Sequence, residues 1–248
     1  TKHGLRPDDL ADPIGAVRRA IEASLRRLGQ QKVEVFQLHN RIGWGGASWL
    51  TPYDVLRPGG VADAFSAVKD AGLADHIGLT ALGDGNAVRD VIASRRFETA
   101  QVYINALNQS AARNAPPGHD TTDFRGVLGA CAAHGLGVFA IRILAAGVLA
   151  TSTRHGREIP VTLNADIDAE AARAAALWPA IGDQDEPNAA TAIRYALSEP
   201  GVSPAVFGAA TLDHVDIALA AGKAGPLDAH LAAKLQQHFN KGLQPTQT

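Results

Sequence analysis

The chain has 248 residues, of which 46% are hydrophobic, and its formal net charge is -2. A chain of this length and apolar content can fill one core, so we expect a single domain over residues 1–241 and a polar tail over residues 242–248. Positive and negative side chains are interspersed, which leaves no basic face for nucleic acid or for an anionic membrane. The expected partner is therefore a small molecule.

The cysteine count and the chain start bear on location. Cys131 is the one cysteine, which excludes a disulfide within the chain and is typical of a reducing compartment. No apolar run is long enough to span a bilayer, and residues 1–4 do not resemble a signal peptide. We therefore expect a cytoplasmic protein, with Cys131 as a small core residue. Because the sequence holds no Met, we also expect Thr1 to be a processed or truncated end.

The first clear elements are a helix and a strand. Asp12 supplies an N-cap oxygen and Pro13 a helical φ, and Gly29 ends the pattern. Between them the apolar positions share one helical face: Ile14, Val17, Ile21, Leu25 and Leu28. The β-branched and aromatic run 33–38 then predicts a buried strand that ends in polar residues. A long loop over residues 41–60 and a helix over residues 61–71 follow.

The same alternation continues along the chain. Further strands are predicted at 76–80, 99–104, 137–144 and 204–208, with helices at 86–94, 123–134, 165–177 and 188–198. Strands that alternate with helices predict right-handed crossovers and a parallel sheet, and polar residues gather where the strands end. In a barrel that edge carries the active site. No glycine-rich phosphate fingerprint follows any strand, which disfavours a Rossmann fold.

Several short motifs, in order, resemble those of the aldo-keto reductase family. They are Thr1-Lys2, Gln37-Leu38-His39-Asn40, Ile77-Gly78-Leu79-Thr80, Ala100-Gln101-Val102-Tyr103-Ile104-Asn105, Ala145-Ala146-Gly147-Val148-Leu149 and Ala196-Leu197-Ser198-Glu199-Pro200-Gly201-Val202-Ser203. The resemblance covers nearly the whole chain. It implies an α/β fold, a (β/α)8 TIM-type barrel of which this chain lacks about the first two βα units. The segments around residues 39–43 and 79–83 are also similar to the branch with bacterial aldose and pyridoxal dehydrogenases.

The resemblance implies an oxidoreductase that passes hydride between a nicotinamide cofactor and an aldehyde, ketone or sugar. The family uses a Tyr acid/base, helped by a Lys, an Asp and a His. An ammonium lowers the pKa of the phenol, and a carboxylate holds the ammonium in place. Lys2 matches the family Lys and His39 the family His. Since the matching Asp and Tyr would lie upstream of Thr1, we expect the chain as written to be inactive.

The family pattern also implies the residues that contact NADP(H) or NAD(H). Thr80 and Gln101 match the groups that hold the carboxamide, while Ile141 stands where an aromatic ring usually stacks on the nicotinamide. Arg142 forms either a surface salt bridge or a contact with the pyrophosphate. Ala210 offers no basic group to a 2′-phosphate, so the prediction of the cofactor stays open between NAD(H) and NADP(H). The full predicted set is Thr80, Gln101, Ile141, Arg142, Ile143, Leu144, Gly208, Ala209 and Ala210.

Substrate contacts are expected from Asn40 and from the loop that follows it. Trp44, Trp49 and Tyr53 make up three of the six Trp and Tyr residues of the chain. Aromatic side chains in a glycine-rich loop favour a wall for a sugar ring or another planar ligand. The alternative is that one Trp packs in the core.

Other functions stay open. One is a non-catalytic subunit that resembles aldo-keto reductases, binds dinucleotide and regulates a partner. Another is an unrelated barrel enzyme with Lys2 or Lys69 as a Schiff-base amine; it is disfavoured because Lys69 lies on a helix outside the barrel and Lys2 begins the chain. No histidine has a second ligand at a useful spacing, so no metal is assigned.

Overall fold

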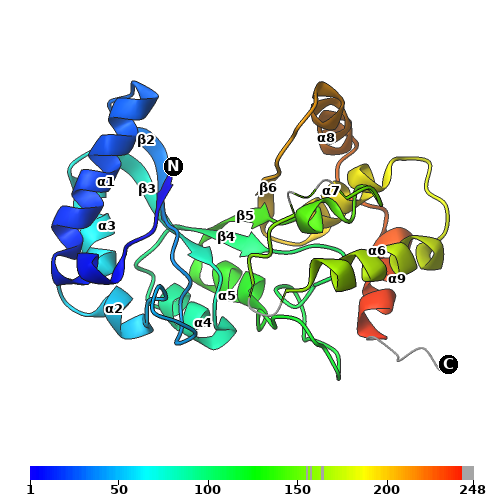
Figure 1. Cartoon of the computed structure of the whole chain (residues 1–248), viewed down its shortest axis with the longest axis horizontal. Helices are drawn as coiled ribbons and strands as arrows, with labels where there is room; N and C mark the ends of the chain where they lie inside the picture. The colour runs from blue at the N-terminus through cyan, green and yellow to red at the C-terminus, as the bar shows by residue number, and fades with distance from the viewer. Residues whose placement is uncertain (155, 157, 163–164, 242–248) are drawn as a thin grey trace. The chain divides into compact units, whose positions relative to one another are not determined.

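A computed structural model describes residues 1–154, 156, 158–162 and 165–241 (Figure 1). The tail expected at residues 242–248 lies outside this range. The first half of the chain runs β1 (Lys2–His3), η1 (Pro7–Ala11), α1 (Pro13–Leu28), β2 (Val33–Leu38), α2 (Pro52–Leu56), α3 (Val61–Asp70), β3 (Ala74–Ala81), α4 (Gly85–Ala93) and β4 (Thr99–Tyr103). The second half runs α5 (Val127–His134), β5 (Gly137–Ile141), η2 (Ala145–Gly147), α6 (Ile167–Ile181), α7 (Asn188–Ser198), β6 (Val202–Ala205), α8 (Leu212–Ala224) and α9 (Ala229–Asn240).

The described chain divides into two compact units. Unit 1 comprises Thr1–Val102 and Val127–Val138, and unit 2 comprises Tyr103–Gly126 and Phe139–Thr248. The expected single domain stays a prediction. None of the helices in the described part of the chain is long and apolar enough to cross a membrane.

The strands follow one another in sequence order. Hydrogen bonds connect them as β1-β2-β3-β4-β5-β6, and the pairs β1-β2, β2-β3 and β3-β4 are all parallel. A parallel sheet with a helical connection between successive strands is the arrangement that the alternation predicted.

Helices cover one face of the sheet in unit 1. Phe36 of β2 stacks on Phe65 of α3 with ring centroids 4.9 Å apart, and both side chains are fully buried. Cys131 on α5 is also fully buried, and burial raises the pKa of its thiol to about 12. The expectation that Cys131 is a core residue is confirmed. The apolar face of the sheet is thus turned to the helices, which leaves the opposite face for other side chains.

Helix α1 begins and ends where the sequence predicted. The Asp12 side chain accepts a hydrogen bond from the Gly15 backbone at 2.9 Å, and Pro13 is the first helical residue. Gly29 closes the helix with φ 63°, a left-handed conformation that glycine adopts at no steric cost.

The predicted loop over residues 41–60 is wrong in its second half, because it contains α2. The Thr51 hydroxyl accepts from the Asp54 backbone N–H at 3.1 Å, and an Asp54 carboxylate oxygen accepts from the Thr51 backbone N–H at 2.9 Å. This is a capping box, and Pro52 at the first helical position completes it. The motif Thr51-Pro52-Tyr53-Asp54 was a readable signal for a helix start.

Other predicted elements differ from the observed ones at their ends. The strand at 137–144 stops at Ile141 because Arg142 has φ 60°, and the helix at 123–134 starts only at Val127 because Arg125 has φ 54°. The strand at 204–208 lies instead at Val202–Ala205. The elements α8 and α9 were not predicted.

A partly buried ion pair holds three segments of unit 2 together. Both carboxylate oxygens of Glu199, which follows α7, accept from Nη2 of Arg113, at 2.8 and 3.0 Å. Nη1 of Arg113 donates to the Tyr195 hydroxyl at 2.9 Å. Gln109, four residues before Arg113, donates to the carbonyl of Leu235 in α9 at 3.0 Å. The segment after β4 is thereby fixed to α7 and α9.

Candidate active site

A row of side chains crosses the sheet of unit 1 on the face away from the helices. The strand register places four residues side by side: Lys2, Gln37, Gly78 and Thr99. Side chains alternate between the two faces along each strand, so this row lies on the face of the sheet opposite to the one that carries Phe36. Gln37 is buried, and its amide nitrogen donates to the Thr99 hydroxyl at 3.4 Å. Gly78 lies between them, where an added Cβ would come within 2.8 Å of the Thr99 carbonyl oxygen.

Two residues further along, a second row occupies the same face. Thr80 and Gln101 are register partners on β3 and β4. His39 directly follows β2, and its backbone N–H donates to the His3 carbonyl at 2.8 Å. The Lys2 ammonium lies 3.5 Å from Oε1 of Gln101, at the outer limit of a hydrogen bond. The fold therefore brings the predicted Lys2, His39, Thr80 and Gln101 to one face of one sheet.

Burial and nearby positive charges both act on the pKa of His39. Partial burial, followed by the positive charges of Lys2 and Arg41, lowers the pKa of His39 below its usual 6.5. The imidazole is therefore neutral at pH 7, with one nitrogen as donor and the other as acceptor. A neutral imidazole can donate a hydrogen bond to an uncharged carbonyl oxygen without supplying a full positive charge.

Thr80 has a buried hydroxyl that no other described residue satisfies. Its side chain is 1% exposed, and Oγ1 has no hydrogen-bond partner. An unpaired buried hydroxyl is destabilising by about 1–3 kcal/mol. Its presence beside the polar row therefore points to a bound group that forms a hydrogen bond with the Thr80 hydroxyl. A primary carboxamide fits, because it presents both donors and an acceptor to the Thr80 hydroxyl and the Gln101 amide.

Asn40 has a structural role in unit 1. Its side-chain oxygen accepts from the Leu5 backbone N–H at 2.8 Å, and its amide nitrogen donates to the carbonyls of Leu5 and Ser48 at 2.8 and 3.1 Å. The side chain is 7% exposed. Asn40 thus ties the segment after β1 to the loop after β2, and its amide is occupied by protein groups.

The aromatic residues of the predicted wall differ in exposure. Trp44 is 67% exposed, and Tyr53, on α2, is 72% exposed. Trp49 is half-buried: the guanidinium carbon of Arg41 lies 6.0 Å from its ring centroid, and the ring covers Gly45 so closely that an added Cβ would meet it at 2.8 Å. Trp49 is therefore held within its loop, whereas Trp44 and Tyr53 are free to contact a ligand.

In unit 2, Arg142 belongs to a cluster of polar groups. Its Nε is buried without a hydrogen-bond partner among the described residues, and its carbonyl accepts from the Asn105 amide at 3.0 Å. Burial raises the pKa of Glu170, and the charge of Arg142 opposes that rise. Burial and the charge of Glu170 raise the pKa of Tyr103. Arg142 therefore lies close to a buried carboxyl group, and the N–H at its Nε is left without an acceptor among the described residues.

The remaining predicted cofactor residues also lie in unit 2. Ile143 is buried, and Ile141 and Leu144 are half-buried. The segment Gly208, Ala209 and Ala210 is exposed; the Ala210 backbone N–H donates to Nδ1 of His214 at 3.2 Å, in the first turn of α8. The chain around Ala210 supplies an imidazole but no Lys or Arg.

Sequence reasoning missed three polar residues near these groups. Gln37 was noted only as part of a motif, although strand alternation from His39 places it on the same face. Tyr103 was likewise quoted only within a motif, and Glu170, which sits in an alanine-rich helix, was not singled out. Among the described residues, no group of three or more His, Cys, Asp or Glu side chains is placed to hold a metal ion.

Comparisons with known proteins give one consistent result. A family model described as the aldo/keto reductase family matches residues 12–240. The apo form of aldo-keto reductase AKR11C1 from Bacillus halodurans is similar in structure, with a TM-score of 0.67 and 20% identity over 94% of this chain and 71% of that chain. Its holo form gives the same TM-score and identity over 95% and 71%. No curated protein matches the sequence. The structural likeness confirms the predicted fold class, with six strands here.

Proposed function

Because the chain belongs to the aldo/keto reductase family, whose members are NAD(P)-dependent oxidoreductases of carbonyl compounds, we propose that Lys2 and His39 are its catalytic residues. The observation that carries the proposal is the polar face of the sheet in unit 1. Lys2, His39, Thr80 and Gln101 come from four separate segments and lie on that one face. The reaction is hydride transfer between nicotinamide and an aldehyde, ketone or sugar.

The two catalytic side chains would act on the substrate oxygen. His39 is neutral near pH 7 because burial and the charges of Lys2 and Arg41 lower its pKa, so its N–H orients and polarises a carbonyl. The Lys2 ammonium supplies a positive charge on the same face, which stabilises negative charge that develops on that oxygen. In the reverse direction the same groups would hold an alkoxide.

Thr80 and Gln101 would hold the nicotinamide carboxamide, and the bound cofactor would supply or accept the hydride. In unit 2, we propose that Ile141, Ile143 and Leu144 give apolar contacts and that Arg142 and residues 208–210 contact the phosphates. Ala210 has no Lys or Arg beside it, and Asp213 lies in the first turn of α8. We therefore propose that NADH binds at least as tightly as NADPH.

The acid/base group of the family is a tyrosine, and this sequence holds three. Tyr53 lies exposed on α2, whereas Tyr103 and Tyr195 are buried in unit 2, where burial raises the pKa of each. A raised pKa makes a phenol a weaker acid, the opposite of what the reaction needs. We propose that this chain alone binds cofactor without turnover. Trp44 and Tyr53 are the proposed substrate contacts, with Trp49 and Asn40 holding the loop in shape.

The test is cofactor binding by quenching of tryptophan fluorescence, on the wild type, Thr80→Val and Thr80→Ser. Valine keeps the shape of Thr80 and removes the hydroxyl, so binding of NADH weakens about tenfold, while serine keeps it. Absence of NADH and NADPH binding in the wild type contradicts the proposed function.

Carbonyl-dependent oxidation of NADH is measured in parallel on this chain and on a version extended upstream. Turnover only in the extended chain, abolished by His39→Ala, supports the enzyme. Binding without turnover in both indicates instead a regulatory dinucleotide-binding subunit.

A further inference from the structure

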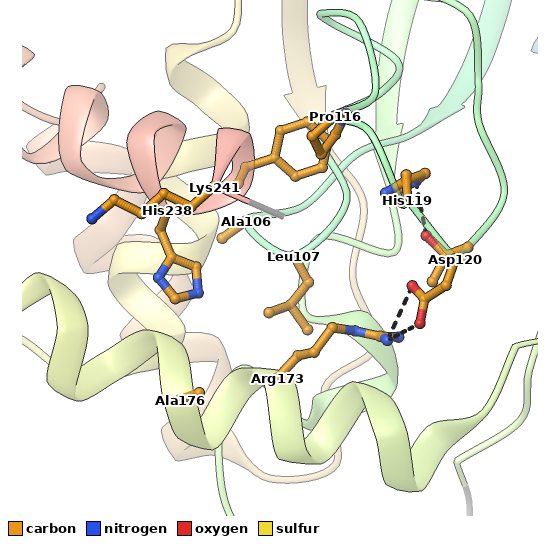
Figure 2. A pocket seen from close by; sticks show the side chains of 12 residues that line it. Ala106, Leu107, Pro116, His119, Asp120, Arg173, Ala176, His238 and Lys241 are labelled. Atoms are coloured by element: carbon orange, nitrogen blue, oxygen red, sulfur yellow. Dashed lines mark hydrogen bonds and ion pairs between the residues drawn. The ribbon is translucent and has the colours of Figure 1, made fainter. Parts of the chain in front are cut away.

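Unit 2 contains a cavity that none of the proposed active-site residues lines. Its volume is about 320 Å³, at the small end of ligand pockets. The wall is built from the segment after β4, from α6 and from the end of α9. Figure 2 shows Leu107 in the middle of these side chains, with His238 over α6 on one side and Arg173 reaching toward Asp120 on the other.

Apolar side chains form the body of the cavity. Leu107 and Pro116 come from the segment after β4, Ala176 from α6 and Phe239 from α9. The Phe239 ring meets the His119 imidazole edge to face, with centroids 5.7 Å apart. Such a wall suits a small planar or aliphatic group.

Arg173 is a cation with a loosely bound partner. Its side chain is only 14% exposed, yet both contacts to Asp120 come from Nη1, at 3.4 and 3.5 Å, and Asp120 is 53% exposed. A charge-assisted N–H to carboxylate bond is normally about 2.7–2.9 Å long. Arg113 in the same unit shows the contrast, since its Nη2 makes two bonds to Glu199 at 2.8 and 3.0 Å.

The charge balance of the wall is positive. Among the lining residues, Arg173 and Lys241 are cations and Asp120 is the carboxylate; Glu170, which does not line the cavity, also interacts electrostatically with Arg173. Nε2 of His119 is engaged with the Thr121 hydroxyl at 3.0 Å, which orients that ring. A ligand anion on the Arg173 guanidinium would make the short bonds that Asp120 does not.

We propose that this cavity is a binding site for a small carboxylic acid with an apolar body, whose carboxylate pairs with Arg173 while the body lies on Leu107, Pro116 and Phe239. None of the proposed hydride-transfer residues lines this cavity, and the proposal does not depend on the proposed function. Its ligand is recognised by one anionic group and one apolar group of fragment size.

Benzoate is the probe. Benzamide serves as its neutral isostere, and acetate as a carboxylate that lacks the apolar ring. Binding is followed by amide NMR shifts at Gly118 and Thr121, which belong to the cavity wall. A ligand of this size binds with a dissociation constant on the order of 1 mM. We expect benzamide and acetate each to bind about tenfold more weakly than benzoate, because each lacks one of the two interactions.

Three variants locate the site. Arg173→Gln removes the cation, and Ala176→Leu fills the apolar part from an exposed helix position that tolerates leucine; each weakens benzoate binding about tenfold or more. Lys223→Gln, on exposed α8, removes an equal charge outside the cavity and leaves binding unchanged. Equal binding of benzoate and benzamide, no effect of Arg173→Gln, or equal loss in Lys223→Gln would overturn the proposal. His39→Ala leaves benzoate binding intact, which separates this result from that for the active site.

Discussion

Gly78 shows how one residue shapes the polar face of the sheet in unit 1. It stands between Gln37 and Thr99 in the register, and the hydrogen bond between those two side chains passes over the position that a Cβ would occupy. A methyl group there also approaches the Thr99 carbonyl oxygen to 2.8 Å. The polar face of the sheet therefore requires a residue without a side chain at position 78.

We expect Gly78→Ala to lower the free energy of unfolding by about 2 kcal/mol, since the added methyl forces apart β3 and β4. Urea denaturation followed by circular dichroism measures the loss. Gly129 on α5 is the matched control, because a Cβ there meets nothing within 4 Å. Gly129→Ala is expected to stabilise the helix by up to about 1 kcal/mol. Equal effects of the two variants would contradict this account.

Glu98 provides a pH-dependent contact at the start of β4. Burial raises the pKa of its carboxyl, but hydrogen bonds from Lys69 and from the Ile77 backbone N–H outweigh burial, and the pKa lies below its ordinary 4.5. A depressed carboxyl pKa stabilises the fold above the unfolded pKa, and that stability is lost as pH falls through the folded pKa.

Glu98→Gln should therefore cost about 1 kcal/mol at pH 7, a modest value because the side chains of Glu98 and Lys69 are more than a third exposed. The difference from wild type should shrink as the pH falls below the ordinary carboxyl pKa of 4.5 and the wild-type carboxylate becomes protonated. Urea midpoints at several pH values measure this. Glu22→Gln, in an exposed pair with Arg18, serves as the control and should change stability by only about 0.3 kcal/mol.

At the scale of elements, local chemistry decides which boundaries a sequence reveals. Helix α1 was predicted from Asp12, Pro13 and Gly29, because each acts on the adjacent backbone. Strand β5 was predicted too long, because the left-handed Arg142 that ends it is set by its surroundings and not by its side chain. Helix α2 was missed although Thr51 and Asp54 mark its start.

The cap of α1 offers a direct test at this scale. Asp12→Ala removes the acceptor for the Gly15 N–H and should destabilise unit 1 by about 1 kcal/mol, while Asp12→Ser keeps a capping oxygen and should cost at most a few tenths. Thermal unfolding compares the three proteins. A loss of the same size in Asp12→Ser would mean that the negative charge matters more than the hydrogen bond.

At the scale of the whole molecule, the alternation of strands and helices was enough to predict the parallel sheet. His39 and Thr80 were also expected at one edge, since parallel strands bring their carboxyl ends together, whereas Lys2 and Gln101 were predicted only from the resemblance to the aldo-keto reductase family. The cavity of unit 2 was not, because its wall joins residues 106–121, 173–176 and 238–241, which no local pattern relates. Pairing of Arg113 with Glu199 was equally invisible, as the two residues are 86 positions apart.

The ion pair between Arg113 and Glu199 predicts which part of the molecule unfolds locally first when it is broken. Glu199→Gln leaves the guanidinium of Arg113 buried with a neutral partner and should destabilise unit 2 by about 3 kcal/mol. Hydrogen exchange should then quicken in residues 104–126, α7 and α9, and stay slow in β2 and β3. Tyr195→Phe removes the hydroxyl that accepts from the same guanidinium but leaves the ion pair in place, and should cost only about 1 kcal/mol. Uniform acceleration across both units would contradict the prediction.

The burial of Cys131 has a practical consequence. Its thiol is shielded and almost entirely protonated at neutral pH, so thiol reagents cannot modify it while α5 stays in place. The rate of labelling by an aromatic disulfide reagent in native buffer is then a measure of how often this part of unit 1 opens. Since the chain has no second cysteine, every labelling event reports the same opening, and no engineered probe is needed to follow it.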